Sequence, residues 1–315
     1  MSIKFHLPNF TEKFKFNLVY LSMMQNCKQF LRDDVEIASV FGVFPPSVWN
    51  GGRTQGGTCD KKYINTVLKS FNNLGVPLRF TFTNPMLEKK HLNDKFCNMV
   101  MQMADNGLNE VIVMSPLLEE YIRKTYPNYK ITSSTCKRLN DVDALNAELE
   151  KDYNLVVMDY DLNNQFDQLE KIKHKEKCEI LVNAVCQPKC PRRSDHYKSI
   201  GLQQIAYCEH IAKYPNRPFN LKNVVLPEYL DIKDCPSMDK TLFDTKDYPT
   251  HIKPDDIYEK YVPMGFHHFK IEGRTSGLFN LMETYLYYMV KPECRDEATF
   301  MLLINLNENG VIDIL

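Results

Sequence analysis

The feature that most constrains the fold is a regular alternation of short apolar segments with longer segments of helical spacing. Eight apolar segments read as strands, and most are followed by a predicted helix. This order predicts a parallel sheet covered by helices, and eight repeats are the number that closes a (β/α)8 TIM-like barrel. A doubly wound open sheet is the alternative. The predicted strands cover residues 35–43, 78–84, 110–114, 130–135, 155–159, 178–183, 224–227 and 266–272.

The two ends of the chain lie outside this repeat. Apolar residues at helical spacing predict an N-terminal helix within residues 10–31. No Pro/Ser-rich linker or shift in composition divides the rest of the chain. We therefore expect an α/β protein with an N-terminal helical segment over residues 1–34, one barrel, irregular in places, over residues 35–292, and a C-terminal tail over residues 293–315 that packs on the barrel.

The composition is that of an ordinary soluble globular protein, with 43% apolar and 25% charged residues among 315. A formal net charge of -1 gives no general attraction to nucleic acid or to anionic membranes, although it does not exclude nucleic acid. No apolar run approaches the roughly 20 residues that span a bilayer. Residues 1–15 lack the order of a signal peptide. We therefore expect a cytoplasmic protein without a membrane span.

The last predicted strand ends in charge. Side chains alternate along a strand, so Lys270, Glu272 and Arg274 share one face, and Phe269 and Ile271 share the other. Three charged groups on one face are costly in a core but tolerable at the mouth of a barrel, beside a ligand. A salt-bridged edge strand is the alternative. We expect Lys270 and Arg274 to bind an anionic group such as a carboxylate.

Polar residues stand at or directly after the ends of most of the predicted strands. In a barrel these ends meet at one face, where they would form the rim of a pocket. For Asn84 and Ser115, helix capping is the more typical role. We expect Glu272 and Asp159 to orient Arg274 or to move protons. The polar strand ends are Asn84, Ser115, Thr135, Asp159, Asn183 and Glu272.

A glycine-rich loop after the first predicted strand, residues 49–57, carries Arg53 among four glycines. Backbone amides in such a loop suit an anion, with Arg53 as its charge partner. The loop matches no phosphate-binding fingerprint, so a flexible turn is the alternative.

Ten cysteines are many for a chain of this kind, and in the cytoplasm clustered thiols indicate metal binding or catalysis rather than disulfides. Four of them, Cys186, Cys190, Cys208 and Cys235, suit an iron–sulfur cluster or a tetrahedral zinc site. They do not form two tight CxxC pairs, which favours a cluster with ligands from separate loops. Free thiols are the third interpretation. Cys59 or Cys178 could replace Cys208 or Cys235.

The segment Asn183-x-x-Cys186-x-x-x-Cys190-Pro191-x-Arg193-x-x-His196, followed far downstream by Phe269-Lys270-Ile271-Glu272-Gly273-Arg274, resembles the collagenase-like U32 peptidase family. The resemblance covers about residues 35–290. It implies a TIM-like barrel and, as in several relatives, an oxygen-sensitive 4Fe–4S cluster on four cysteines, with Asn183 and Arg193 beside it. It also implies hydroxylation of RNA bases or of the ubiquinone ring without molecular oxygen, in some relatives with prephenate as the oxygen donor.

The leading hypothesis is therefore an iron–sulfur barrel enzyme that modifies a small molecule or a nucleobase. Its partners would be a small substrate, a carboxylate donor, and a redox partner or a second protein of the same family. A thiol- or metal-dependent peptidase is the second hypothesis, because His196 and Arg192 could activate a thiolate in the same loop. A non-catalytic binding module stabilised by metal is the third.

Overall fold

The computed structural model describes residues 2–232, 235–237 and 240–313. In these residues eight parallel strands pair in sequence order, and the last returns to the first to close a barrel. The predicted (β/α)8 barrel is confirmed, and the open sheet is excluded. The strands are β1 (Ile3–Pro8), β2 (Val35–Gly42), β3 (Leu78–Phe82), β4 (Glu110–Val113), β5 (Lys130–Ser133), β6 (Leu155–Val157), β7 (Cys178–Leu181) and β8 (His268–Lys270).

The first strand lies where only a helical segment was predicted. β1 pairs with β2 on one side and with β8 on the other, so the barrel begins at residue 3 and not at residue 35. The strand predicted at residues 224–227 is wrong, because Val225 is 95% exposed and lies between two short 3-10 helices. The number eight is right because one missed strand and one false strand offset each other.

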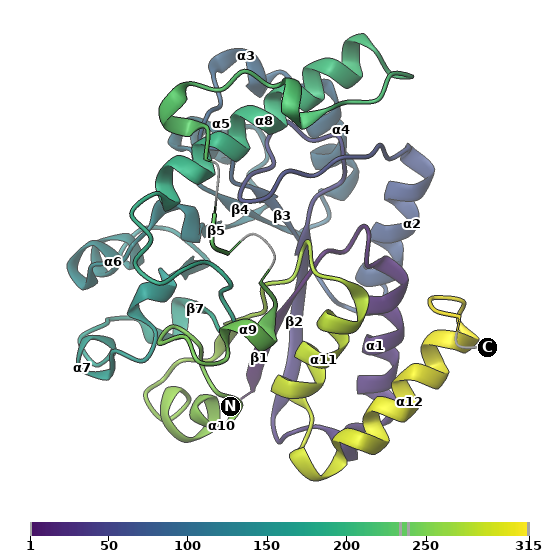
Figure 1. Ribbon diagram of the computed structural model, residues 1–315, viewed down its shortest axis with the longest axis vertical. Helices are drawn as coiled ribbons and strands as arrows, with labels where there is room; N and C mark the ends of the chain where they lie inside the picture. The colour runs from purple at the N-terminus through teal and green to yellow at the C-terminus, as the bar shows by residue number, and fades with distance from the viewer. Residues whose placement is uncertain (1, 233–234, 238–239, 314–315) are drawn as a thin grey trace.

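Helices surround the barrel (Figure 1). Several begin at a side-chain cap, since Asp60, Asp94, Ser115 and Asp141 each accept a hydrogen bond from the backbone N–H three residues further on. The capping role expected for Ser115 is confirmed. The helices are α1 (Phe14–Asn26), α2 (Lys61–Asn72), α3 (Lys89–Leu92), α4 (Lys95–Ala104), α5 (Pro116–Thr125), α6 (Val142–Leu149), α7 (Phe166–Leu169), α8 (Arg193–Lys213), α9 (Leu242–Thr245), α10 (Pro254–Asp256), α11 (Leu278–Met289) and α12 (Arg295–Glu308).

The C-terminal residues form α12, which packs against α1 and α11, so helices from opposite ends of the chain lie side by side (Figure 1). Its buried residues, Ala298, Leu302 and Leu306, recur every four positions and so share one face of the helix. Among the described helices, none combines the length and the apolar character that crossing a bilayer requires.

Charged side chains lie inside the barrel, below the end at which the strands have their carboxyl termini. Arg79 on β3 and Glu179 on β7 are fully buried, and the Arg79 Nη1 donates to Glu179 Oε2 over 2.5 Å. The apolar neighbours on the same strands, such as Phe80 and Ile180, join the main core instead. Strand alternation thus separates an ionic interior from an apolar layer beneath the helices.

Candidate active site

A cavity of about 660 Å³ opens at the carboxyl ends of the barrel strands. Its floor is formed by side chains from within the barrel, including Phe41, Thr81, Ile112, Leu181 and Lys270. Its walls come from the segments that follow six strands, namely Arg53 after β2, Thr83 after β3, Cys136 after β5, Tyr160 after β6, Cys186 after β7 and Glu272 after β8. This is the end of a TIM-like barrel at which such enzymes place their chemistry.

The glycine-rich loop after β2 reaches the cavity because it lies directly on the end of β3. A Cβ atom on Gly51 would meet the Thr83 carbonyl oxygen at 2.3 Å, so only glycine fits there. Gly52 has a φ of +72°, in the left-handed region that glycine adopts without strain. This close approach carries the next residue, Arg53, into the cavity wall.

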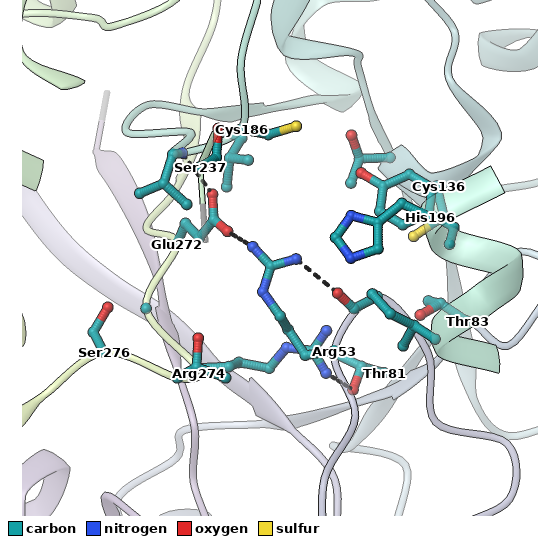
Figure 2. Close-up of a pocket in the computed structure, with 18 of the residues that line it drawn as sticks. Arg53, Thr81, Thr83, Cys136, Cys186, His196, Ser237, Glu272, Arg274 and Ser276 are labelled. Atoms are coloured by element: carbon teal, nitrogen blue, oxygen red, sulfur yellow. Dashed lines mark hydrogen bonds and ion pairs between the residues drawn. The ribbon is translucent and has the colours of Figure 1, made fainter. Parts of the chain in front are cut away.

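Arg53 and Glu272 form an ion pair across the cavity (Figure 2). Glu272 lowers the free energy of the charged guanidinium and raises the pKa of Arg53. The other Glu272 carboxylate oxygen accepts from the Val185 N–H at 3.1 Å. Asn183 holds the Glu272 backbone from both sides, because its Nδ2 donates to the Glu272 carbonyl oxygen at 3.0 Å and its Oδ1 accepts from the Glu272 N–H at 2.7 Å.

Arg274 enters the cavity with neutral partners. Its Nη1 donates to Asn50 Oδ1 at 3.1 Å and to Thr81 Oγ1 at 3.0 Å, and its Nη2 donates to the Gly51 carbonyl oxygen at 2.8 Å. Burial, followed by the charge of Arg53, lowers the pKa of Arg274 to about 10. Within the described residues no ion pair joins Arg274 to an acidic side chain. The hydrogen bonds that hold Arg274 therefore come from Asn50, Thr81 and Gly51 and not from Glu272 or Asp159, and proton transfer by these two carboxylates stays a prediction.

Lys270 lies on the floor of the cavity and is 7% exposed. Its Nζ donates to Glu179 Oε1 at 2.9 Å and stands 4.1 Å from the centre of the Phe41 ring. The expected alternation of the last strand is seen, because Lys270, Glu272 and Arg274 all line the cavity whereas Phe269 and Ile271 are fully buried in the apolar core.

Asp159 and Arg193 form a buried pair beside the cavity. The Arg193 Nη1 donates to both Asp159 carboxylate oxygens, at 2.7 and 3.0 Å, and its Nη2 donates to Asp161 at 2.9 Å. The Arg193 guanidinium also stacks over the Tyr160 ring at 4.0 Å. Arg193 is the first residue of α8 and Asp159 follows β6, so their ion pair holds the start of α8 against the end of β6. Arg193 and Tyr160 also line the cavity.

The four cysteines predicted as metal ligands do not converge. Cys186 and Cys235 line the cavity, and Cys190 lies near enough to Cys186 to raise the pKa of its thiol. Cys208 lies further along α8, outside the cavity lining, where its Sγ accepts from Gln204 Nε2 at 3.6 Å. In the part of the chain that the structure describes, no three His, Cys, Asp or Glu side chains are placed to hold a metal ion. The described arrangement does not fit a four-cysteine cluster.

The cavity also contains a thiol and an imidazole that stay neutral. Burial raises the pKa of the Cys186 thiol, against a hydrogen bond from Tyr160 that lowers it. Burial and the cations Arg53 and Arg192 lower the pKa of His196. Figure 2 shows Cys186 near Glu272 and the His196 ring beside the Arg53 guanidinium. No hydrogen bond joins His196 to a cysteine in the described residues, so the thiolate–imidazolium pair of a thiol peptidase is not assembled.

Most predicted site residues meet at this cavity, but others were missed. Cys136, which was not among the cysteines predicted as ligands, is buried in the cavity wall after β5. Two buried residues were also missed, namely Glu179, which pairs with Lys270, and Arg79, which pairs with Glu179. Their signal was present, since each is the one charged residue of its predicted strand.

No protein-family model matches the chain. A match of 197 residues at 27% identity joins it to a curated protein of Methanocaldococcus jannaschii named uncharacterized protease MJ1657, and covers 59% of this chain and 52% of that protein. The chain thus spans about half the length of this curated relative. The solved structure of the U32 peptidase Mk0906 covers 87% of this chain and 94% of its own, with 9% identity and a TM-score of 0.48. The match to a protease confirms the predicted resemblance to a peptidase family as a distant one.

Proposed function

We propose that this distant relative of the U32 peptidases is a barrel enzyme that binds a small organic carboxylate at Arg274, in the cavity at the carboxyl ends of the strands. The observation that carries the proposal is the state of Arg274. It is a guanidinium in the cavity wall whose three hydrogen bonds go to neutral oxygens. A cation removed from water is costly unless an anion is near it, so the cavity favours a negatively charged ligand.

A carboxylate suits this position better than a neutral ligand because a guanidinium recognises it through two parallel hydrogen bonds. Arg53 stands near enough to lower the pKa of Arg274 and adds positive charge, although Glu272 neutralises part of it. Lys270 is already paired with Glu179, so the ligand anion is assigned to Arg274. Thr81 and Thr83 supply hydroxyl groups in the same cavity.

A thiol peptidase is the less favoured reading, although the curated relative is named a protease. Such an enzyme needs a thiolate beside an imidazolium, whereas here burial favours the neutral forms of both Cys186 and His196. Iron–sulfur dependence and oxygen-independent hydroxylation remain predictions from the family resemblance. No step is assigned to a cluster, because the described cysteines do not form its ligand set.

The test is calorimetric titration of the full chain with benzoate and succinate, each compared with its neutral amide. We expect the carboxylates to bind and the amides to bind weakly. Arg274→Gln should lower the carboxylate affinity by more than tenfold, since loss of one partner of a desolvated charge pair costs about 2–5 kcal/mol.

The matched control is Arg123→Gln, which removes an arginine that is paired with Glu119 and Asp152 on the outer layer. It should leave carboxylate binding unchanged. Circular dichroism would verify that Arg274→Gln is folded. Equal affinity for acids and amides, or wild-type affinity in folded Arg274→Gln, would reject the proposal.

A further inference from the structure

Lys270 carries an amine that carboxylate binding leaves unused. It is the last residue of β8, and its side chain points into the barrel and reaches the floor of the cavity. An ammonium group has three donors, and the described residues engage one of them, with Glu179 Oε1 at 2.9 Å. The remaining surroundings are the face of Phe41 and the cavity itself.

The residues around Lys270 limit how well its positive charge is compensated. Glu179 is shared, because its other oxygen binds Arg79 at 2.5 Å, and Arg79 also lies 3.3 Å from Glu110. His6 stands 3.7 Å from Glu179 and hydrogen-bonds His268 at 3.0 Å, and burial lowers the pKa of both histidines. The guanidinium charges of Arg79 and Arg274 also act on Lys270 and lower its pKa, in addition to burial.

These conditions favour a neutral amine. Burial, offset in part by Glu179, lowers the pKa of Lys270 to about 8. At pH 8 about half of the molecules would then carry an uncharged Lys270 amine, compared with well under one in a hundred for an ordinary lysine. A desolvated lysine next to another cation is the usual setting of a nucleophilic amine.

We infer that Lys270 forms an imine with the carbonyl carbon of an oxo acid whose carboxylate binds Arg274. The Lys270 Nζ attacks the carbonyl carbon, a C–N bond forms, and the carbonyl oxygen takes up protons and leaves as water. One amine and one carbonyl give one imine and one water, without an oxidant or reductant. The Glu179 carboxylate, 2.9 Å from Nζ, would accept a hydrogen bond from the protonated imine. This inference rests on the proposed carboxylate site.

The test is reductive trapping of the full chain at pH 8. Pyruvate, levulinate and 4-carboxybenzaldehyde serve as probes with different distances between carbonyl and carboxylate, and sodium cyanoborohydride reduces any imine to a stable amine. Peptide mass mapping should place a saturable adduct on Lys270 with at least one probe. Lys270→Arg should lose this adduct, and benzaldehyde, which lacks the carboxylate, should label Lys270 at least about tenfold less efficiently. Arg274→Gln should raise the probe concentration for half-labelling by about tenfold or more.

The outcomes separate the inference from the proposed function. No adduct on Lys270 of the wild-type chain with any of the three probes, while benzoate still binds in an Arg274-dependent manner, overturns the imine and leaves the carboxylate site standing. Equal labelling by benzaldehyde and 4-carboxybenzaldehyde overturns recognition of an oxo acid. Absence of carboxylate binding overturns both. Mapping the wild-type protein keeps the test decisive even if Lys270→Arg does not fold.

Discussion

The ionic interior of the barrel allows a quantitative prediction at Glu179. Its side chain is fully buried, with Arg79 at 2.5 Å and Lys270 at 2.9 Å. Glu179→Gln keeps the shape of the side chain but removes the charge that both cations share. Breaking a buried ion pair on one side costs about 3–5 kcal/mol, because a charge is left uncompensated. In a protein of 315 residues that corresponds to a fall in melting temperature of roughly 5–8 °C.

The assay is urea denaturation at pH 7, followed by circular dichroism. Glu36→Gln, an exposed glutamate on β2, is the matched control and should change stability by less than about 0.5 kcal/mol. Adding Lys270→Met to Glu179→Gln removes one of the two cations that have lost their carboxylate partner. The double variant should therefore recover part of the lost free energy of unfolding. A cost below about 1 kcal/mol for Glu179→Gln, or strict additivity in the double variant, would refute the idea that Glu179 holds these cations together.

Three further predictions concern the strand that carries the cavity residues and the cysteines. The pKa of Lys270 is about 8 in the folded protein, below its ordinary 10.5, so between these pH values the unfolded chain binds one more proton than the folded protein. The free energy of unfolding, compared with that of Lys270→Met in urea denaturation, should therefore rise by up to about 3 kcal/mol between pH 8 and 10.5. A difference that does not change with pH would contradict this. Ile271→Ala should cost about 2–5 kcal/mol because the side chain is fully buried, whereas Ile304→Ala at a 40% exposed position should cost much less. If anaerobically purified protein contains iron and sulfide, Cys186→Ser should abolish iron binding. Cys208→Ser should retain the iron, because Cys208 lies outside the cavity lining. Loss of iron in Cys208→Ser would show that the chain rearranges to bind a cluster.

The fold class was predictable because the alternation of strands and helices remains recognisable when single strands are assigned wrongly. β1 was missed because its six residues include His6 and Pro8, which weaken the pattern of a buried strand. Residues 224–227 were mistaken for a strand because a short apolar run has no period of its own. Whether such a run is a strand depends on neighbouring strands to which it can hydrogen-bond. In the structure β7 pairs directly with β8, so no strand lies between them.

The site was predictable where it depends on the direction of the strands. Parallel strands bring their carboxyl ends together, so the gathering of Glu272, Arg274 and the Cys186 loop at one cavity follows from the fold class alone. Partner choice does not follow from it. Arg79 and Glu179 are 100 positions apart, and their pairing depends on the register of strands that sequence patterns do not fix.

The closure of the barrel between β1 and β8 has a consequence for how the chain reaches its structure. Lys4 pairs with His268 and Phe5 with Phe269, so this pairing joins residues that lie 264 positions apart in the sequence. During synthesis β1 is made first, yet one of its edges has no partner until β8 has left the ribosome. Contacts this distant in sequence slow folding, and an unpaired strand edge invites association with other chains. Arg274 lines the cavity and follows β8 directly in the sequence. The complete cavity can therefore form only after β8 has paired with β1.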